Sequence, residues 1–174
     1  MDVVRSNIEK LRGTVEISST PGKGSTFTLR LPLTLAIIDG MMVRVGSERY
    51  IIPTIMITES LRPTDTNVFS VQQKGRMILL RGSLIPLFPL HRIFNIAEAI
   101  QDPTEAILVV AESNTKRCAI MVDEIVDQQQ VVIKNLGKIF EGVKSVSGGA
   151  IMGDGRVALI LDVEGIISAA VNTL

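Results

Sequence analysis

Residues 80–87 read LRGSLIPL and residues 153–160 read GDGRVALI, and these two stretches follow one pattern. Each contains a tight turn that ends in a glycine, Gly82 in the first stretch and Gly155 in the second, with an apolar strand on either side. Such glycine turns between apolar runs are typical of β-hairpins. A short helical segment is predicted after each second strand. The same small β-unit is therefore predicted to occur twice.

The repeat extends upstream of both hairpins. Residues 48–52 (ERYII) match residues 116–120 (KRCAI) in pattern, and each opens a hairpin that continues into a long strand. The repeat length is about 70 residues, and a unit that occurs twice predicts two similar small β-barrels rather than a solenoid, which needs about three copies to bury its core. Closing each sheet into a barrel also removes its exposed edges.

From residue 37 onward, short apolar segments alternate with turns rich in Gly, Asn and Pro. No long amphipathic helix separates them, which argues against a parallel sheet. We place barrel one at about 37–100 and barrel two at about 101–174, with exchange of strands between them left open. Strands are predicted near 37–45, 48–52, 55–61, 67–72, 76–81, 84–88, 105–112, 116–122, 124–133, 147–152 and 156–161, and short helices near 89–95 and 163–171.

Residues 1–36 differ in pattern from the rest of the chain. Apolar side chains recur every three or four residues from Met1 to Leu11, which is typical of one face of a helix that ends before Gly13. Two alternating strands follow, near 14–18 and 26–31. A lone helix and hairpin cannot bury their apolar faces, so this segment is predicted to belong to a larger domain.

The composition excludes several classes of function. The 18 basic and 18 acidic residues cancel and form no basic run, which argues against nucleic acid as a partner. One His and one Cys are too few for a zinc site of the usual nitrogen and sulfur ligands, and no cofactor is predicted. The longest apolar stretch is interrupted by Pro and charged residues, so we expect no insertion into a membrane.

The stretch GKGST at residues 22–26 has some likeness to a phosphate-binding loop. That loop requires Ser or Thr directly after the Lys, whereas Gly24 follows Lys23 here. The stretch is therefore interpreted as a hairpin turn.

The other candidates for chemistry are also better explained structurally. His91 is interpreted as a surface or half-buried structural residue, because no orienting partner for a general base is evident. Cys118 lies in a predicted strand and is interpreted as a small buried side chain. Asp123, Glu124 and Asp127 are interpreted as a solvated loop or binding rim rather than as a catalytic pair of carboxylates.

Several motifs, in order, resemble the CheA family of chemotaxis histidine kinases. One group resembles the end of the family's GHKL-type ATP-binding domain, and the other resembles its C-terminal regulatory domain. The first group is MDVVR (1–5), LRG (11–13), PGKGSTF (21–27) and LPLTLA (31–36), and the second is NLG (135–137), SGGAIMGDG (147–155) and VALILD (157–162).

The resemblance implies a mainly β fold: two intertwined SH3-like barrels of the CheW-like type over 37–174, preceded by an α-β-β remnant of the ATP-binding domain over 1–36. It implies a regulatory domain that binds the adaptor CheW and chemoreceptor tips, in the cytoplasm at receptor arrays beneath the inner membrane. The partner-binding residues that it implies are Ile57, Glu59 and Arg81. A stand-alone CheW-type adaptor is the alternative.

The same resemblance bears on catalysis and self-association. The elements that bind ATP in this family would precede Met1, so we expect this chain to be no enzyme and to bind no ATP, although the parent protein would be an ATP-dependent histidine kinase. We also expect residues 1–35 to self-associate, or else to be mobile, because their apolar side chains lack a core. Those side chains are Val4, Ile8, Leu11, Val15, Ile17, Phe27, Leu29 and Leu31.

Overall fold

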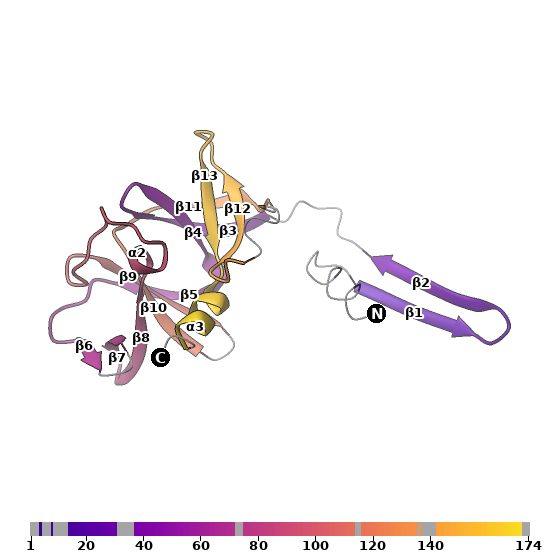
Figure 1. Ribbon diagram of the computed structural model, residues 1–174, viewed down its shortest axis with the longest axis horizontal. Helices are drawn as coiled ribbons and strands as arrows, with labels where there is room; N and C mark the ends of the chain where they lie inside the picture. The colour runs from indigo at the N-terminus through magenta and orange to yellow at the C-terminus, as the bar shows by residue number, and fades with distance from the viewer. Residues whose placement is uncertain are drawn as a thin grey trace. The chain divides into compact units, whose positions relative to one another are not determined.

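The computed structural model describes Val4, Ile8 and residues 14–30, 37–71, 75–113, 116–134, 136 and 142–171. The chain divides into two compact units, Met1–Ala36 and Ile37–Leu174. In Figure 1 the first unit carries β1 and β2, and the second carries all the other labelled elements. No helix among the described residues is both long and apolar enough to cross a membrane.

The first unit contains an antiparallel hairpin of β1 (Thr14–Thr20) and β2 (Gly24–Arg30). The turn comprises residues 21–23, and the rest of the GKGST stretch begins β2, which confirms the prediction of a hairpin. Val15 lies opposite Leu29 and Ile17 lies opposite Phe27, so apolar side chains share one face of the ribbon. Val4 and Ile8 are helical, and the other residues of the predicted helix lie outside the described residues.

The regular elements of the second unit are mostly strands, at the positions that its alternating apolar segments predict. The helical segments among its described residues are brief. The strands are β3 (Ile37–Val45), β4 (Glu48–Pro53), β5 (Ile57–Leu61), β6 (Val68–Val71), β7 (Gly75–Leu80), β8 (Ser83–Pro89), β9 (Ile107–Ser113), β10 (Lys116–Val122), β11 (Glu124–Val132), β12 (Val146–Ile151) and β13 (Val157–Leu161), and the helices are η1 (Thr54–Met56), α2 (Leu90–Ile93) and α3 (Val163–Val171).

The strands form two sheets. Each sheet contains strands from both halves of the unit, residues 37–101 and residues 102–174. The six-stranded sheet has the order β5-β9-β10-β8-β7-β6, and the five-stranded sheet has the order β11-β3-β4-β13-β12. The β9–β10 hairpin is thus inserted between strands of the first half, and the β3–β4 hairpin between strands of the second half. Each half therefore contributes its first hairpin to the sheet of the other half.

No parallel sheet forms, as expected, but the insertion creates one parallel pair of strands in each sheet. β10 pairs with β8 in parallel, and β13 pairs with β4 in parallel, within sheets that are otherwise antiparallel. Parallel neighbours from consecutive segments need a long crossover, usually a helix. Here they come from distant segments brought together by the inserted hairpins, so no crossover helix is required.

The five-stranded sheet curls back upon itself. Lys134, which follows β11 at one edge, forms an antiparallel bridge with Gly149 of β12 at the other edge. The backbone N–H of Lys134 donates to the carbonyl of Gly149 at 2.8 Å, and the reverse hydrogen bond is 3.0 Å long. This bridge joins the two edge strands, which would otherwise present unpaired backbone groups.

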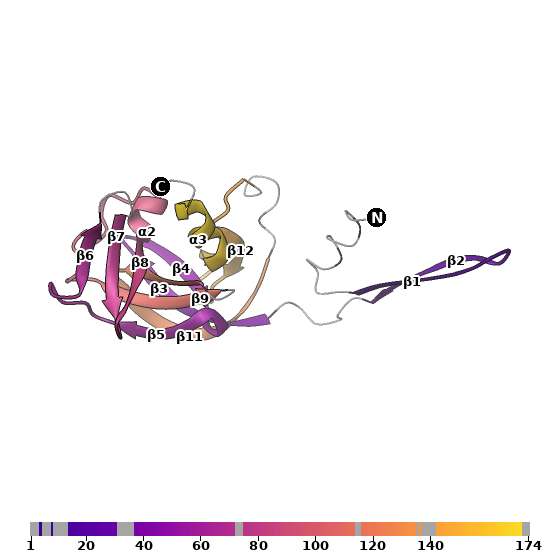
Figure 2. The same ribbon diagram turned by 90° about the horizontal axis from the view of Figure 1, so that it is seen from below.

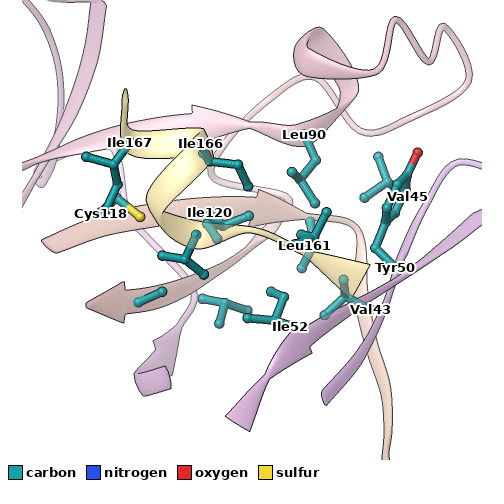
Figure 3. Packing of buried hydrophobic residues seen from close by; sticks show 14 of the residues in the cluster. Val43, Val45, Tyr50, Ile52, Leu90, Cys118, Ile120, Leu161, Ile166 and Ile167 are labelled. Atoms are coloured by element: carbon teal, nitrogen blue, oxygen red, sulfur yellow. The ribbon is translucent and has the colours of Figure 1, made fainter. Parts of the chain in front are cut away.

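A hydrophobic cluster between the two sheets forms the central core (Figure 3). Side chains converge on it from β3 and β4, from β9 and β10, and from α3. Val43, Ile52, Val109 and Ile120 are fully buried there. Burying such a side chain contributes about 1.5–3 kcal/mol, so the shared cluster stabilises both sheets at once.

Figure 2 shows the second unit turned by 90° from the view of Figure 1. In both views β6 and β7 lie toward one end of this unit, and β12 lies toward the other end. The glycine turns of the two repeated hairpins, β7–β8 and β12–β13, consequently belong to different ends of the domain.

Candidate functional site

The turn between β7 and β8 holds Arg81 in an unusual backbone conformation. Arg81 has a φ of 50° and Gly82 a φ of 82°, and Leu80 pairs with Ser83 across the turn. Positive φ at both central residues of a two-residue hairpin loop is the signature of a type I′ turn, which favours Asn-Gly. A side chain in the left-handed region costs about 1–2 kcal/mol relative to the usual backbone. An arginine here is therefore kept at some cost to stability, which points to a function for its side chain.

Glu59 on β5 holds the guanidinium group of Arg81. Arg81 Nη2 donates to Glu59 Oε2 at 3.0 Å. The Glu59 side chain is 25% exposed and the Arg81 side chain 78% exposed. A guanidinium carries five N–H donors, so this hydrogen bond leaves donors of Arg81 for a partner. The structure thus brings together two of the three residues that the resemblance implied.

Ile57 lies on the same strand but in a different environment. A β-bulge falls between Ile57 and Glu59, where β5 pairs with β9, and a bulge redirects the side chains on either side of it. Ile57 is half-buried and packs against the central cluster. It therefore supports β5 from the core side, and only part of its side chain can meet a partner.

Two exposed leucines next to Arg81 were missed by the sequence reasoning. Leu79 pairs with Leu84 across the β7–β8 ladder, and these side chains are 40% and 52% exposed. Ile78 and Ile85, the neighbours of these leucines, are buried. Residues 77–80 are four consecutive apolar residues, so the sequence did not show which of them face solvent.

The second repeated hairpin has a similar arrangement. Ile151 pairs with Val157 across the β12–β13 ladder, and these side chains are 57% and 58% exposed. At its turn, Asp154 accepts a hydrogen bond from Arg49 Nη1 at 2.8 Å. The pKa of Asp154 is lowered, first by the hydrogen bond from the Arg156 backbone N–H and also by the charge of Arg49. Each hairpin tip therefore pairs an exposed apolar patch with an ion pair.

Asp123 is a structural anchor and not part of a solvated rim as expected. Its Oδ2 accepts from the Gly46 backbone N–H at 2.7 Å, and its Oδ1 accepts from the Ile100 backbone N–H at 3.1 Å. Glu124 and Asp127, by contrast, are exposed. The sequence could not show this difference because both partners of Asp123 are distant along the chain.

His91 and Cys118 are both buried, although His91 was expected to be a surface or half-buried residue. His91 is buried, and its pKa is lowered by desolvation and by Arg92, with Asp123 acting in the opposite direction. Burial raises the pKa of the Cys118 thiol to about 12, which disfavours the reactive thiolate. In the parts of the chain that the structure describes, no group of three or more His, Cys, Asp or Glu residues could hold a metal ion.

Comparison with protein families matches residues 39–171 to the CheW-like domain. Residues 39–171 cover most of the second unit. Among solved structures, the scaffolding protein TtCheW from Thermoanaerobacter tengcongensis superimposes with a TM-score of 0.62 at 16% identity, covering 72% of this chain and 89% of that protein. This likeness establishes the fold, which is mainly β with a CheW-type arrangement.

Curated relatives match both units. The chain is 45% identical over 172 residues to the chemotaxis protein CheA of Rhizobium meliloti and 43% identical over 164 residues to that of Klebsiella aerogenes. It is 35% identical over 170 residues to the sensor histidine kinase CheAY of Helicobacter pylori. These matches cover 94–98% of this chain but only 21–25% of the relatives. The chain thus spans about a quarter of the length of these relatives.

Proposed function

The chain belongs to the CheW-like domain family, and we propose that it is the regulatory and scaffold-coupling domain of a chemotaxis histidine kinase. The observation that carries this proposal is the coverage of the CheA relatives, which extends over 94–98% of the chain at 42–45% identity. The CheW-like family match begins only at residue 39. A stand-alone adaptor would account for the second unit and leave the first unexplained, so the kinase is favoured over the adaptor.

The same proposal extends to the domain organisation. Residues 1–36 are the remnant of a GHKL-type ATP-binding domain, and residues 37–174 are the regulatory domain. The two sheets of residues 37–174 correspond to two SH3-like barrels that have exchanged hairpins. The bridge between the edges of the five-stranded sheet supports the barrel assignment, and the hairpin with one apolar face supports the assignment of the remnant.

The proposed partner-binding site comprises Arg81, Glu59 and Ile57, together with the Leu79–Leu84 pair. Arg81 provides exposed hydrogen-bond donors, Glu59 fixes their position, and the leucines provide apolar contact area. Interfaces commonly combine an exposed Arg with apolar neighbours in this way. The proposed partners are the adaptor CheW and the cytoplasmic tips of chemoreceptors, and the proposed location is the cytoplasmic receptor array beneath the inner membrane.

Binding of the adaptor tests this function directly. We expect the purified chain to bind its cognate CheW with micromolar or tighter affinity in a calorimetric titration. Because the interface combines charged and apolar groups, added salt should weaken the binding without abolishing it. An unrelated SH3 domain serves as the control titrant. A chain that is folded by circular dichroism and gives no heat with CheW would contradict the proposal.

The chain is also proposed to have no catalytic role of its own. In the family that it resembles, the ATP-binding elements precede the segment equivalent to residues 1–36. We therefore expect no heat of ATP binding at micromolar concentrations and no ATP hydrolysis above the buffer control. Measurable turnover by the purified chain would show that residues 1–174 carry a nucleotide site.

The apolar face of the β1–β2 hairpin is proposed to pack against the rest of the ATP-binding domain in the parent kinase. In the isolated chain we expect this hairpin to associate with the same hairpin of a second molecule. Ile17, Phe27 and Leu29 are 55%, 55% and 51% exposed. Half-exposed side chains of this size offer roughly 300–400 Å² per molecule, which is below the ~800 Å² per partner of a stable interface. The association should therefore be weak and concentration-dependent.

Light scattering on two chains tests this expectation. The average mass of the full chain should rise with concentration, whereas a chain lacking residues 1–33 should stay monomeric and retain the second unit. The matched control is Thr28→Ser, a change on the polar face of the same hairpin, which should leave the concentration dependence as it is. Identical monomeric masses for the full and truncated chains would reject self-association.

A further inference from the structure

The two halves of the second unit complete each other's sheets. The β9–β10 hairpin pairs with β5 on one side and with β8 on the other, so without it β5 would lose contact with the rest of its sheet. In the same way, the β3–β4 hairpin joins β11 to β13. Each half taken by itself would contain a gap the width of a hairpin in the middle of its sheet.

The cores are divided between the halves in the same manner. Inside the six-stranded sheet, Ile78 and Ile85 of the first half pack with Leu108 and Met121 of the second half. The cluster of the five-stranded sheet also combines both halves. Met42 and Ile51 come from the first half, and Ala158, Ile160 and other residues come from the second. The central cluster also mixes both halves. A half-domain alone would leave part of every cluster exposed to water, which opposes its folding.

The covalent link between the halves contributes little to these contacts. Gln101 and Asp102 are exposed and lie outside all strands. The backbone carbonyl of Gln101 accepts from Arg76 Nη1 at 3.2 Å, and Asp102 accepts from the backbone and hydroxyl groups of Thr104. Cutting the chain at this point would interrupt no strand pairing.

We propose that the two halves, residues 37–101 and 102–174, are binding partners of each other independently of the chain that links them. Each half provides a groove for an apolar β-hairpin that pairs antiparallel on one side and parallel on the other. The other half supplies that hairpin. This property concerns assembly of the domain itself and does not depend on what the domain binds.

A cleavable full chain tests the proposal. A protease site is inserted between Gln101 and Asp102, and the folded chain is cut. The two pieces should elute together at the mass of the uncut chain and unfold in one cooperative transition. The two pieces are then separated in denaturant and returned to buffer. Neither residues 37–101 nor residues 102–174 should unfold cooperatively when the other piece is absent. Mixing the two pieces should restore the cooperative unfolding transition. Separation of the cut chain into two independently folded species, or failure of the mixed halves to reassemble, would overturn the proposal.

A pair of variants on β9 sharpens the test in the cut chain. Leu108 is fully buried in the cluster that the halves share, whereas Glu112 on the same strand is exposed. Leu108→Ala should raise the dissociation constant of the two pieces by about 30-fold or more, as expected for truncation of a buried leucine. Glu112→Ala should change it less than about threefold, as expected for an exposed charge. Equal effects of the two variants would show that the pieces are not held together through the inserted hairpin.

Discussion

Gly165→Ala is expected to lower the free energy of unfolding by about 3 kcal/mol or more, because there is no space for a methyl group at this position. A Cβ built on Gly165 would lie 1.6 Å from the backbone carbonyl oxygen of Lys144. The segment around Lys144 is held in place, since the Asp162 backbone N–H donates to the Ser145 carbonyl at 3.0 Å. To accept alanine, α3 would have to move away from the core that it covers with Val163, Ile166 and Ile167.

The direction of this effect is informative because helix propensity predicts the opposite. Glycine in a helix is about 1 kcal/mol less favourable than alanine, so the same change in an open helix would stabilise the protein. A loss of about 3 kcal/mol corresponds to a melting temperature lower by roughly 6–12 °C for a domain of this size. Gly142→Ala is the matched control, because no described residue lies within 4 Å of its added Cβ. Thermal unfolding of Gly165→Ala at or above the temperature of the unchanged chain would contradict the packing described here.

Arg81→Asn is expected to weaken binding of CheW by about 30-fold or more while leaving the fold intact. This loss follows from the proposed role of Arg81 in binding, because substitution of an arginine that anchors an interface commonly costs about 2 kcal/mol or more. Asparagine is favoured at the first position of a type I′ turn, so the backbone strain at Arg81 should be relieved. That gain offsets the lost ion pair with Glu59, which is worth only about 0–1 kcal/mol at an exposed site. The melting temperature should therefore be unchanged or slightly higher.

This variant separates binding from stability because the two quantities should move independently. Calorimetric titration with CheW measures the affinity, and thermal unfolding measures the stability of the same preparation. Arg30→Asn is the matched control: it removes an exposed arginine that pairs with Glu16 at 3.3 Å in the first unit. Binding by Arg81→Asn that equals the affinity of the unchanged chain would remove Arg81 from the site.

The proposed partner-binding site was only partly accessible from the sequence. The resemblance to the kinase family pointed to Arg81 and Glu59, but these residues are 22 positions apart, and their ion pair joins the β7–β8 turn to β5, which is adjacent to neither strand in the sheet. Leu79 and Leu84 were missed because their exposure depends on the register between β7 and β8. Asp123 was misassigned because its hydrogen-bond partners, Gly46 and Ile100, lie 77 and 23 positions away.

The sequence by itself determined which segments are strands. Alternation of apolar residues and the placement of glycine turns are local signals, and they located the strands of the second unit and the repeat within it. Turn chemistry also identified the GKGST region as part of a hairpin, since the residue spacing needed for a phosphate loop is absent.

Only the tertiary structure decided which strands pair across the two halves of the second unit. A strand's pattern shows which of its faces is buried but not the identity of its neighbours, because almost every residue offers the same backbone N–H and C=O groups for pairing. The insertion of β3–β4 between β11 and β13, and of β9–β10 between β5 and β8, follows from the apolar clusters that both halves must bury together. Those contacts join residues far apart in the chain, so they become visible only when the whole domain has folded.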